Sequence, residues 1–343
     1  MVLDDAVAPT SDGTVRWGIL ATGGIARIFT RDLLVHGHRV TAVGSRSYAT
    51  ARAFADEFGI ERAHGSYDEL VADPQVDVVY VATPHNLHLA NATAALEQAK
   101  HVLVEKSFTV NAAEARQLAA LARSKRLLVL EAMWTRFLPH MHFVRDVVGS
   151  GRIGEVRTLH ADHAQQLPAD PAHRLNDPDL AGGALLELGV YPLSFAHDLA
   201  GPPTEVLARG TLRTTGVDAS VATVLTHANG VVSTSFSSSE VRGPNNATVV
   251  GTKGRIEIAP FWYTPTRVTV YDNHDEVTAT FDEPFSGRGM QYQAAEVERL
   301  LATGETESPL LALDDSIAVL TTMDAARRAL GVHYGADHLD PLP

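Results

Sequence analysis

The sequence predicts an α/β domain with a doubly wound parallel sheet, followed by an α+β domain with an open, mostly antiparallel sheet that carries helices on one face. Apolar runs alternate with helical segments up to residue 137, which is typical of βαβ units. Beyond that point, strand-like segments rich in Thr, Val and Ser follow one another across short turns. The length of 343 residues suits two domains, and 45% hydrophobic with 20% charged residues is typical of a folded chain.

The first domain is expected over residues 15–137. It follows a loose acidic tail, residues 1–14, that has neither the basic nor the apolar stretch of a secretory signal. Its strands are nearly continuous apolar runs, as they are when helices cover both faces of a parallel sheet. Strands are expected at 15–20, 39–43, 76–82, 101–104 and 127–131, and helices at 25–36, 49–58, 67–72, 87–98 and 112–124.

The second domain is expected over residues 138–343. Short turns at 228–230 and 252–254 favour an antiparallel meander. Strands are expected at 156–163, 206–212, 219–227, 231–238, 247–251, 255–258, 267–271 and 276–281, and helices at 140–148, 185–199, 291–301 and 314–330.

Composition argues against several classes of partner. The 28 Lys and Arg residues against 41 Asp and Glu give a net charge of −13, which disfavours nucleic acid. No run approaches the roughly 18–20 apolar residues that span a membrane. Cysteine is absent, which excludes disulfides and thiolate chemistry and fits a cytoplasmic location. His160 and His163 alternate along one expected strand without a third ligand, so no metal site is expected.

The turn after the first strand predicts a dinucleotide site. It contains Ala21, Thr22, Gly23, Gly24 and Ile25. Small residues there let the backbone approach a pyrophosphate at a helix N-terminus, and the βαβ context makes this more probable than a merely glycine-rich turn. Ala21 stands where a first glycine is usual. The turn identifies the first domain as a Rossmann domain.

The second strand predicts which nucleotide binds. It ends at Ser45 and Arg46 without the carboxylate that would accept hydrogen bonds from the ribose of NAD. A guanidinium can instead hold a 2′-phosphate, although Arg46 could also be a solvated surface cation. We therefore predict NADP, with NAD less favoured.

Two later strand ends face the same crevice of a doubly wound sheet. Thr83, Pro84, Asn86 and His88 follow the strand expected at 76–82 and are expected to touch the cofactor, although His85, His88 and Asn86 could be helix-start residues only. Glu105 and Lys106 follow the strand expected at 101–104. A lysine beside a nicotinamide could bind a substrate hydroxyl and lower the pKa of a neighbouring phenol, whereas in isolation a surface lysine is the simpler interpretation.

An ordered set of motifs resembles the Gfo/Idh/MocA oxidoreductases. The set comprises the glycine-rich turn, Glu105-Lys106, Gly151–Val156 and Gly182–Tyr191. Residues 109–115, 131–137 and 173–180 are similar to the branch that holds dimeric dihydrodiol dehydrogenase and NADP-dependent D-xylose dehydrogenases. The resemblance covers about residues 15 to 335. It implies a substrate cleft between two domains, a homodimer and a catalytic pair of Lys106 and Tyr191.

Two residues depart from the family pattern. Ser107 replaces a proline that would hold Lys106 extended, and Glu187 stands where the wider family has aspartate. The pair itself is chemically sound, because a tyrosine with a pKa of about 10 becomes a usable base when positive charge favours its phenolate. The phenolate would take the hydroxyl proton as hydride leaves carbon.

The remaining candidates have alternatives. Trp134 and Arg136 could contact cofactor, and Trp134 and Phe137 substrate, or all three could pack at a domain interface. Arg174 could bind substrate or pair with Asp177. We predict an NADP-dependent dehydrogenase acting on a hydroxyl of a small aldose, polyol or cyclic diol, with Glu187 among the substrate residues. The alternatives are a ketoreductase of a nucleotide-linked keto sugar and a catalytically silent NADP-binding sensor.

Overall fold

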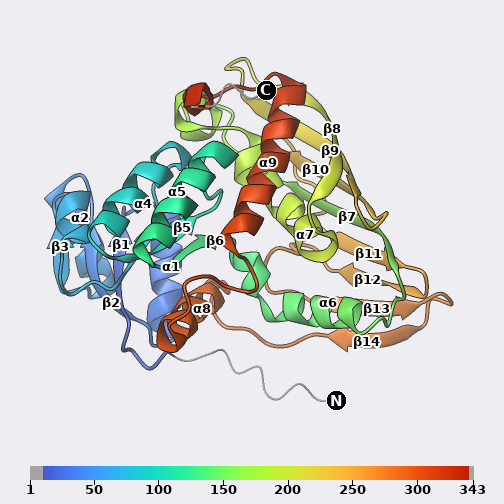
Figure 1. Cartoon of the computed structure of the whole chain (residues 1–343), viewed down its shortest axis with the longest axis horizontal. Helices are drawn as coiled ribbons and strands as arrows, with labels where there is room; N and C mark the ends of the chain where they lie inside the picture. The colour runs from blue at the N-terminus through green and yellow to red at the C-terminus, as the bar shows by residue number, and fades with distance from the viewer. Residues whose placement is uncertain (1–10, 340–343) are drawn as a thin grey trace. The chain divides into compact units, whose positions relative to one another are not determined.

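The computed structural model describes residues 11–339, which form two compact units (Figure 1). The first unit contains the residues up to Thr109, Ala113–Phe137 and Phe285–Ser316. The second contains Val110–Ala112, Leu138–Pro284 and the residues from Ile317 onward. The predicted tail falls mostly outside the described residues. None of the helices within residues 11–339 is long and apolar enough to cross a membrane.

The first unit is built on a six-stranded sheet in the order β3-β2-β1-β4-β5-β6, in which all neighbours are parallel. Its strands are β1(Arg16–Leu20), β2(Arg39–Gly44), β3(Arg62–His64), β4(Val78–Val81), β5(His101–Glu105) and β6(Val129–Ala132). The doubly wound parallel sheet is therefore confirmed. The sequence analysis missed β3, because its three residues, Arg-Ala-His, contain no apolar run.

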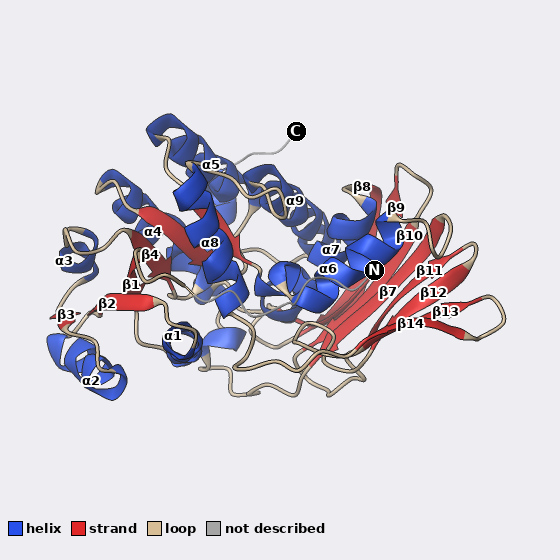
Figure 2. Cartoon of the chain, turned by 90° about the horizontal axis from the view of Figure 1, so that it is seen from below, coloured by secondary structure: helices blue, strands red, loops and turns tan. Residues whose placement is uncertain are grey.

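Helices cover both faces of this sheet, which explains why its central strands are buried. They are α1(Gly24–Val35), α2(Tyr48–Phe58), α3(Tyr67–Val71), α4(His88–Glu97), α5(Ala112–Lys125) and α8(Gln291–Thr303). Figure 2 shows α1 and α2 on one side of the sheet and α4 and α5 on the other. All four residues of β4 are buried, as the apolar run predicted.

The segment 285–316 belongs to the first unit, although the sequence analysis places it in the second domain. Its attachment is polar. The Asp32 carboxylate on α1 accepts hydrogen bonds from the backbone N–H groups of Arg288 and Met290, at 3.0 and 2.9 Å. The Trp17 indole donates to Glu298 on α8 at 2.9 Å. These contacts join residues more than 250 positions apart, so no local pattern in the sequence predicts them.

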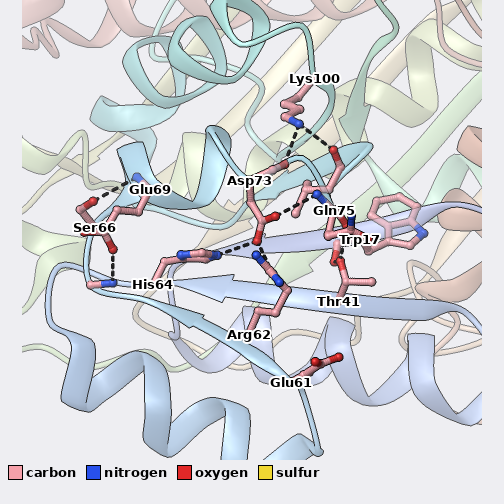
Figure 3. A network of polar contacts seen from close by, with 12 residues as sticks. Trp17, Thr41, Glu61, Arg62, His64, Ser66, Glu69, Asp73, Gln75 and Lys100 are labelled. Atoms are coloured by element: carbon pink, nitrogen blue, oxygen red, sulfur yellow. Dashed lines mark hydrogen bonds and ion pairs between the residues drawn. The ribbon is translucent and has the colours of Figure 1, made fainter.

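A buried carboxylate fixes the outer edge of the first sheet (Figure 3). Asp73 accepts a hydrogen bond from Arg62 Nε at 2.6 Å, and His64 Nε2 lies 2.8 Å from the same oxygen. Burial alone would raise the pKa of Asp73, but the hydrogen bonds from Arg62, Gln75 and His64 outweigh it and lower that pKa. The short strand β3 is thereby tied to the turn that precedes β4.

The second unit is built on an eight-stranded sheet in the order β14-β13-β12-β11-β7-β10-β9-β8. All neighbours are antiparallel except β7 and β10, so the mostly antiparallel prediction is confirmed. The strands are β7(Val156–Ala164), β8(Pro203–Leu212), β9(Asp218–His227), β10(Val232–Ser238), β11(Ala247–Gly251), β12(Gly254–Ile258), β13(Val268–Asp272) and β14(Val277–Phe281).

Helices lie on one face of the second sheet. Figure 2 shows α6(Pro139–Gly149) and α7(Val190–Ala200) over that face. A π-helical turn, η5(Leu185–Gly189), leads into α7, and α9(Leu313–Leu330) belongs mostly to this unit. Residues of β7, β9 and β10 alternate between buried and exposed, which is the pattern of a sheet packed on one side.

Ala21 follows β1 and has a φ of 89°, a region that side chains disfavour and glycine occupies freely. Its N–H donates to Gly44 O at 3.0 Å. The backbone of the turn thus adopts the glycine-type conformation of a dinucleotide fingerprint even though the residue is alanine.

We predict that Ala21→Gly leaves the free energy of unfolding unchanged or raises it by up to about 1 kcal/mol, because glycine relieves the strain at positive φ. Urea denaturation measures it. The matched control is Ala92→Gly, in the middle of α4, which should cost about 1 kcal/mol. A loss of stability at position 21 equal to that at position 92 would contradict the argument.

Candidate functional site

The turn between β1 and α1 has the form of a phosphate-binding site. Gly23 precedes α1, and no side chain caps the first turn of the helix. Gly23 has an ordinary φ of −71°, and a Cβ added at Gly23 or Gly24 would meet no atom within 4 Å. The protein itself therefore does not require glycine at these two positions. The open space and the uncapped N–H groups of Gly24 and Ile25 fit a pyrophosphate placed against the helix N-terminus.

The end of β2 presents a cation beside this turn. Ser45 is buried, and its N–H donates to His64 O at 3.2 Å, so the network around Asp73 also fixes the position of Ser45. Arg46 is exposed, and the described residues place no carboxylate within ion-pair distance of it. Burial raises the pKa of Tyr67 while the charge of Arg46 partly offsets that effect, which places the guanidinium near this phenol. Arg46 is thus a cation suited to an anionic ligand.

The polar side chains that follow β4 make hydrogen bonds to other parts of the first unit. The Thr83 hydroxyl accepts a hydrogen bond from Asn91 at 3.1 Å, and Pro84 precedes the short helical turn η1(His85–Leu87) that contains Asn86. His88 is completely buried; its Nδ1 lies 2.9 Å from Ser107 O and its Nε2 lies 2.9 Å from Thr83 O. Both ring nitrogens thus face backbone carbonyl oxygens, and His88 links the segments that follow β4 and β5.

Lys106 is held in a loop that is anchored by buried carboxylates. Glu105 accepts a hydrogen bond from the Tyr80 hydroxyl inside the core, which directs its side chain away from solvent. Glu131 on β6 accepts from the Phe108 N–H at 3.0 Å and from the Ser316 hydroxyl at 2.6 Å. The peptide bond between Lys106 and Ser107 is cis. Glu131 thus fixes the loop, although serine stands where the family pattern has a proline after the lysine.

Burial raises the pKa of Glu131, and the hydrogen bonds from Ser316 and Phe108 together with the positive charges of Arg136 and Lys106 offset only part of that effect. Positive Lys106 in turn helps to lower the pKa of His88, whose burial is the largest cause. The ammonium group of Lys106 thus lies close to one buried carboxylate and one buried imidazole, which favours a neutral imidazole and an ionised carboxylate.

Trp134, Arg136 and Phe137 lie in the turn η2(Trp134–Phe137) that follows β6, and all three are buried. Arg136 donates from Nη1 to Leu310 O at 3.2 Å. The guanidinium of Arg288 lies 5.5 Å from the Trp134 ring centroid. Both contacts lie within the first unit.

In the second unit, Tyr191 lies in a group of aromatic rings. Its ring meets that of His163 edge-on at 4.8 Å, and His163 stacks on Tyr263 at 3.8 Å. Gln165 Nε2 lies 2.7 Å from His163 Nε2 and 3.2 Å from the Tyr263 hydroxyl. Strand β7 therefore positions a ring beside the phenol of Tyr191. Of this group, the sequence analysis identified only Tyr191 as a site residue, because Gln165 and Tyr263 belong to no motif and His163 was considered only as a metal ligand.

Arg174 and Glu187 form an ion pair of 3.6 Å in the second unit. Asp177, the other partner considered for Arg174, caps a short helical turn by accepting from the Asp179 N–H at 2.9 Å. Two predicted substrate residues are thus brought together. The structure places Lys106 and the predicted cofactor residues in the first unit, and Arg174, Glu187 and Tyr191 in the second.

Comparison with known sequences covers both units. Residues 15–132 match the model of an oxidoreductase family with an NAD-binding Rossmann fold, and residues 141–257 match the GFO/IDH/MocA C-terminal domain. A D-xylose 1-dehydrogenase (NADP(+)) from Hypocrea jecorina is 38% identical across 94% of this chain and 93% of its own. A trans-1,2-dihydrobenzene-1,2-diol dehydrogenase from Homo sapiens is 37% identical across 94% of this chain and 99% of its own.

Comparison with solved structures gives the same result. An aldose-aldose oxidoreductase from Caulobacter crescentus, complexed with glycerol, superposes with a TM-score of 0.83 at 26% identity, over 92% of this chain and 97% of that chain. A 3-ketoreductase from Actinomadura kijaniata, complexed with TDP-benzene and NADP, superposes with a TM-score of 0.79 at 28% identity and the same coverage. The chain belongs to the GFO/IDH/MocA family of oxidoreductases.

Proposed function

We propose that this enzyme is an NADP-dependent dehydrogenase that transfers a hydride between the nicotinamide and a hydroxyl-bearing carbon of a small aldose, polyol or cyclic diol. One observation carries the proposal: curated relatives named as dehydrogenases of D-xylose and of a cyclic diol are 37–38% identical along 94% of the chain. The resemblance in the sequence motifs implies that Lys106 and Tyr191 are the catalytic pair. The absence of cysteine supports a reducing, cytoplasmic compartment.

The first unit fits NADP. Residues 21–25 would hold the pyrophosphate at the N-terminus of α1, and Ser45 with Arg46 would bind the 2′-phosphate. Thr83, Pro84 and Asn86 follow β4 at the carboxyl edge of the same sheet, where a dinucleotide is expected. When bound, the nicotinamide supplies the hydride acceptor or donor.

The chain's own residues manage the proton. Tyr191 would take the proton from the substrate hydroxyl through its phenolate oxygen, and would return it in the opposite direction. The Lys106 ammonium would bind the same hydroxyl and favour the phenolate by its charge. Glu131 and His88 would fix the Lys106 loop through Phe108 N–H and Ser107 O. Arg174 and Glu187 would meet further hydroxyl groups of the substrate.

Turnover of a substrate panel tests this function. Purified enzyme is assayed for NADP⁺ and NAD⁺ reduction with aldoses, inositols and cyclic diols, and for NADPH oxidation with a nucleotide-linked keto sugar. Turnover of an aldose or diol with NADP⁺ supports the proposal. Turnover of the keto sugar alone favours the second candidate, a ketoreductase. The fold that the chain shares with the 3-ketoreductase from Actinomadura kijaniata is the reason to include this substrate. NADPH binding without turnover would favour a sensor.

Replacement of the phenol tests the proton-transfer role. Tyr191→Phe keeps the ring that packs on His163 and removes the titrating hydroxyl, so kcat is expected to fall about 10²–10⁴-fold while the Kd for NADPH is unchanged. Stopped-flow hydride transfer and fluorescence titration measure the two quantities. Wild-type turnover in the variant would show that another group carries the proton.

Replacement of the arginine tests the cofactor preference. Arg46→Gln removes the charge offered to the 2′-phosphate and is expected to raise the KM for NADP⁺ about ten- to a hundredfold, with little change for NAD⁺. The matched control is Arg39→Gln, an exposed arginine at the start of β2. An equal effect on both cofactors would mean that Arg46 does not contact the 2′-phosphate.

We further propose that the enzyme is a homodimer joined through the open face of the second sheet. Leu207, Val224 and Thr234 are neighbours in one row across β8, β9 and β10, and the row continues to His160 on β7. Leu207 is 56% exposed, Val224 42% and Phe236, next on the same face, 41%. Exposed apolar side chains that gather on one face of a sheet are typical of a protein–protein interface. A second copy of the chain supplies the same surface, so an isologous pair would bury it.

Insertion of a charge tests the dimer. Val224→Asp places a carboxylate in the centre of the apolar row and is expected to shift the sedimentation coefficient from dimer to monomer. Val35→Asp is the matched control, because Val35 is 61% exposed at the end of α1 in the first unit. A wild-type enzyme that sediments as a monomer would refute the proposal.

A further inference from the structure

The helix that carries Glu187 and Tyr191 begins at a turn made of two glycines, and both are sterically required. A Cβ on Gly182 would lie 2.6 Å from Leu175 O. Gly183 has a φ of 125°, and a Cβ on it would lie 2.4 Å from Asp218 Oδ1. The turn is therefore packed tightly against backbone on one side and against a buried carboxylate on the other.

Two side chains hold this turn through hydrogen bonds. The Tyr334 hydroxyl donates to Gly182 O at 2.5 Å. Asp218 Oδ2 accepts from the Leu185 N–H at 2.6 Å, at the first turn of the helix. Asp218 is completely buried and Tyr334 is 5% exposed. The two bonds act on either side of Gly183, one on a carbonyl before it and one on an N–H after it, so they fix the direction in which the helix starts.

Each of these side chains is itself anchored. Arg327 on α9 lies 4.7 Å from the Tyr334 ring centroid and pairs with Asp337 at 2.8 Å. Asp337 also accepts from the Tyr334 N–H at 2.8 Å. Asp218 is the first residue of β9, whose register on β8 pairs it with Leu212. Asp218 thus ties the turn to the sheet, and Tyr334 ties it to the C-terminal segment.

We propose that Asp218 and Tyr334 are positioning residues for Tyr191: they clamp the Gly182–Gly183 turn and so set the place of the helix that carries Glu187 and Tyr191. This inference rests on the proposed function, in which Tyr191 transfers the proton. Glu187 lies inside the π-helical turn and Tyr191 directly after it, in the second position of α7. π-Helical turns recur at functional sites because they change the direction of the side chains that follow.

The carboxylate of Asp218 is suited to holding the turn in place. Burial raises the pKa of Asp218 to about 6, while hydrogen bonds from backbone N–H groups and the charge of Arg327 act in the opposite direction. A buried carboxylate with one oxygen, Oδ1, that has no hydrogen-bond partner is costly to retain. Arg327, Tyr334 and Asp337 are the other charged or titratable groups that face this cluster. An ionised acceptor at a helix N-terminus binds the N–H groups more strongly than a neutral one.

Tyr334→Phe tests the clamp with the least disturbance, because the ring remains under Arg327 and only the hydroxyl is lost. We expect kcat to fall about tenfold, since a small displacement of a catalytic group costs that much or more. The KM for NADP⁺ should not change, because the predicted cofactor residues lie in the first unit. Hydrogen–deuterium exchange of the peptide spanning residues 184–191 should be faster than in the wild type.

Asp218→Asn and Asp218→Ala test the second side chain that holds the turn. The amide oxygen of asparagine can still accept from the Leu185 N–H, so Asp218→Asn should retain more of kcat than Asp218→Ala. Tyr271→Phe is the matched control, because Tyr271 also lies under an arginine, 4.3 Å from Arg255, but away from the turn. Its kcat and exchange should equal those of the wild type.

The two readouts separate this inference from the function on which it rests. If the wild type turns over no substrate while exchange at residues 184–191 accelerates in Tyr334→Phe, the clamp stands and the proposed function fails. If the wild type is active and Tyr334→Phe has the same kcat and exchange, the clamp is refuted. The positioning role would also be refuted if Tyr334→Phe lowers the melting temperature but leaves kcat and the exchange rate unchanged at temperatures below the transition.

Discussion

Two buried side chains, His88 and Glu131, hold the loop that follows β5, and the candidate site of the first unit depends on them. His88 meets a carbonyl on one side of the loop and Glu131 an N–H on the other, each at 2.9–3.0 Å. A buried ionisable group that loses its partners is expensive, so neither contact breaks without a large cost. Both contacts are made to the peptide group between Ser107 and Phe108, which directly follows Lys106, so interior residues fix the backbone beside this lysine.

Most of the fold could be predicted because its signals are local. Apolar runs and turn residues determine the central strands and the hairpins, and their predicted ranges agree with the structure to within a few residues. The three-residue strand β3 escaped prediction because it is held by Asp73 from another element. The assignment of residues 285–316 depends on Asp32 and Trp17, whose partners lie far along the chain. Periodicity carries no information about contacts of that range.

The candidate site was predictable only where a motif exists. The glycine-rich turn, Lys106 and Tyr191 could be found from sequence patterns. The ring of Tyr263 beside His163, and the pairing of Arg174 with Glu187, could not, because they come from the register of strands and from a loop without repeating structure. The positive φ of Ala21 could not be predicted either, because alanine at this position gives no sign of a backbone conformation that is typical of glycine.

The return of residues 285–316 to the first unit also has a consequence for biosynthesis. A domain encoded by one continuous segment can complete its core while the rest of the chain is still on the ribosome. Here Trp17 and Asp32 obtain their α8 and loop partners only after every strand of the second sheet has been translated. During synthesis, Trp17 and Asp32 therefore remain without these partners until the last quarter of the chain has left the ribosome.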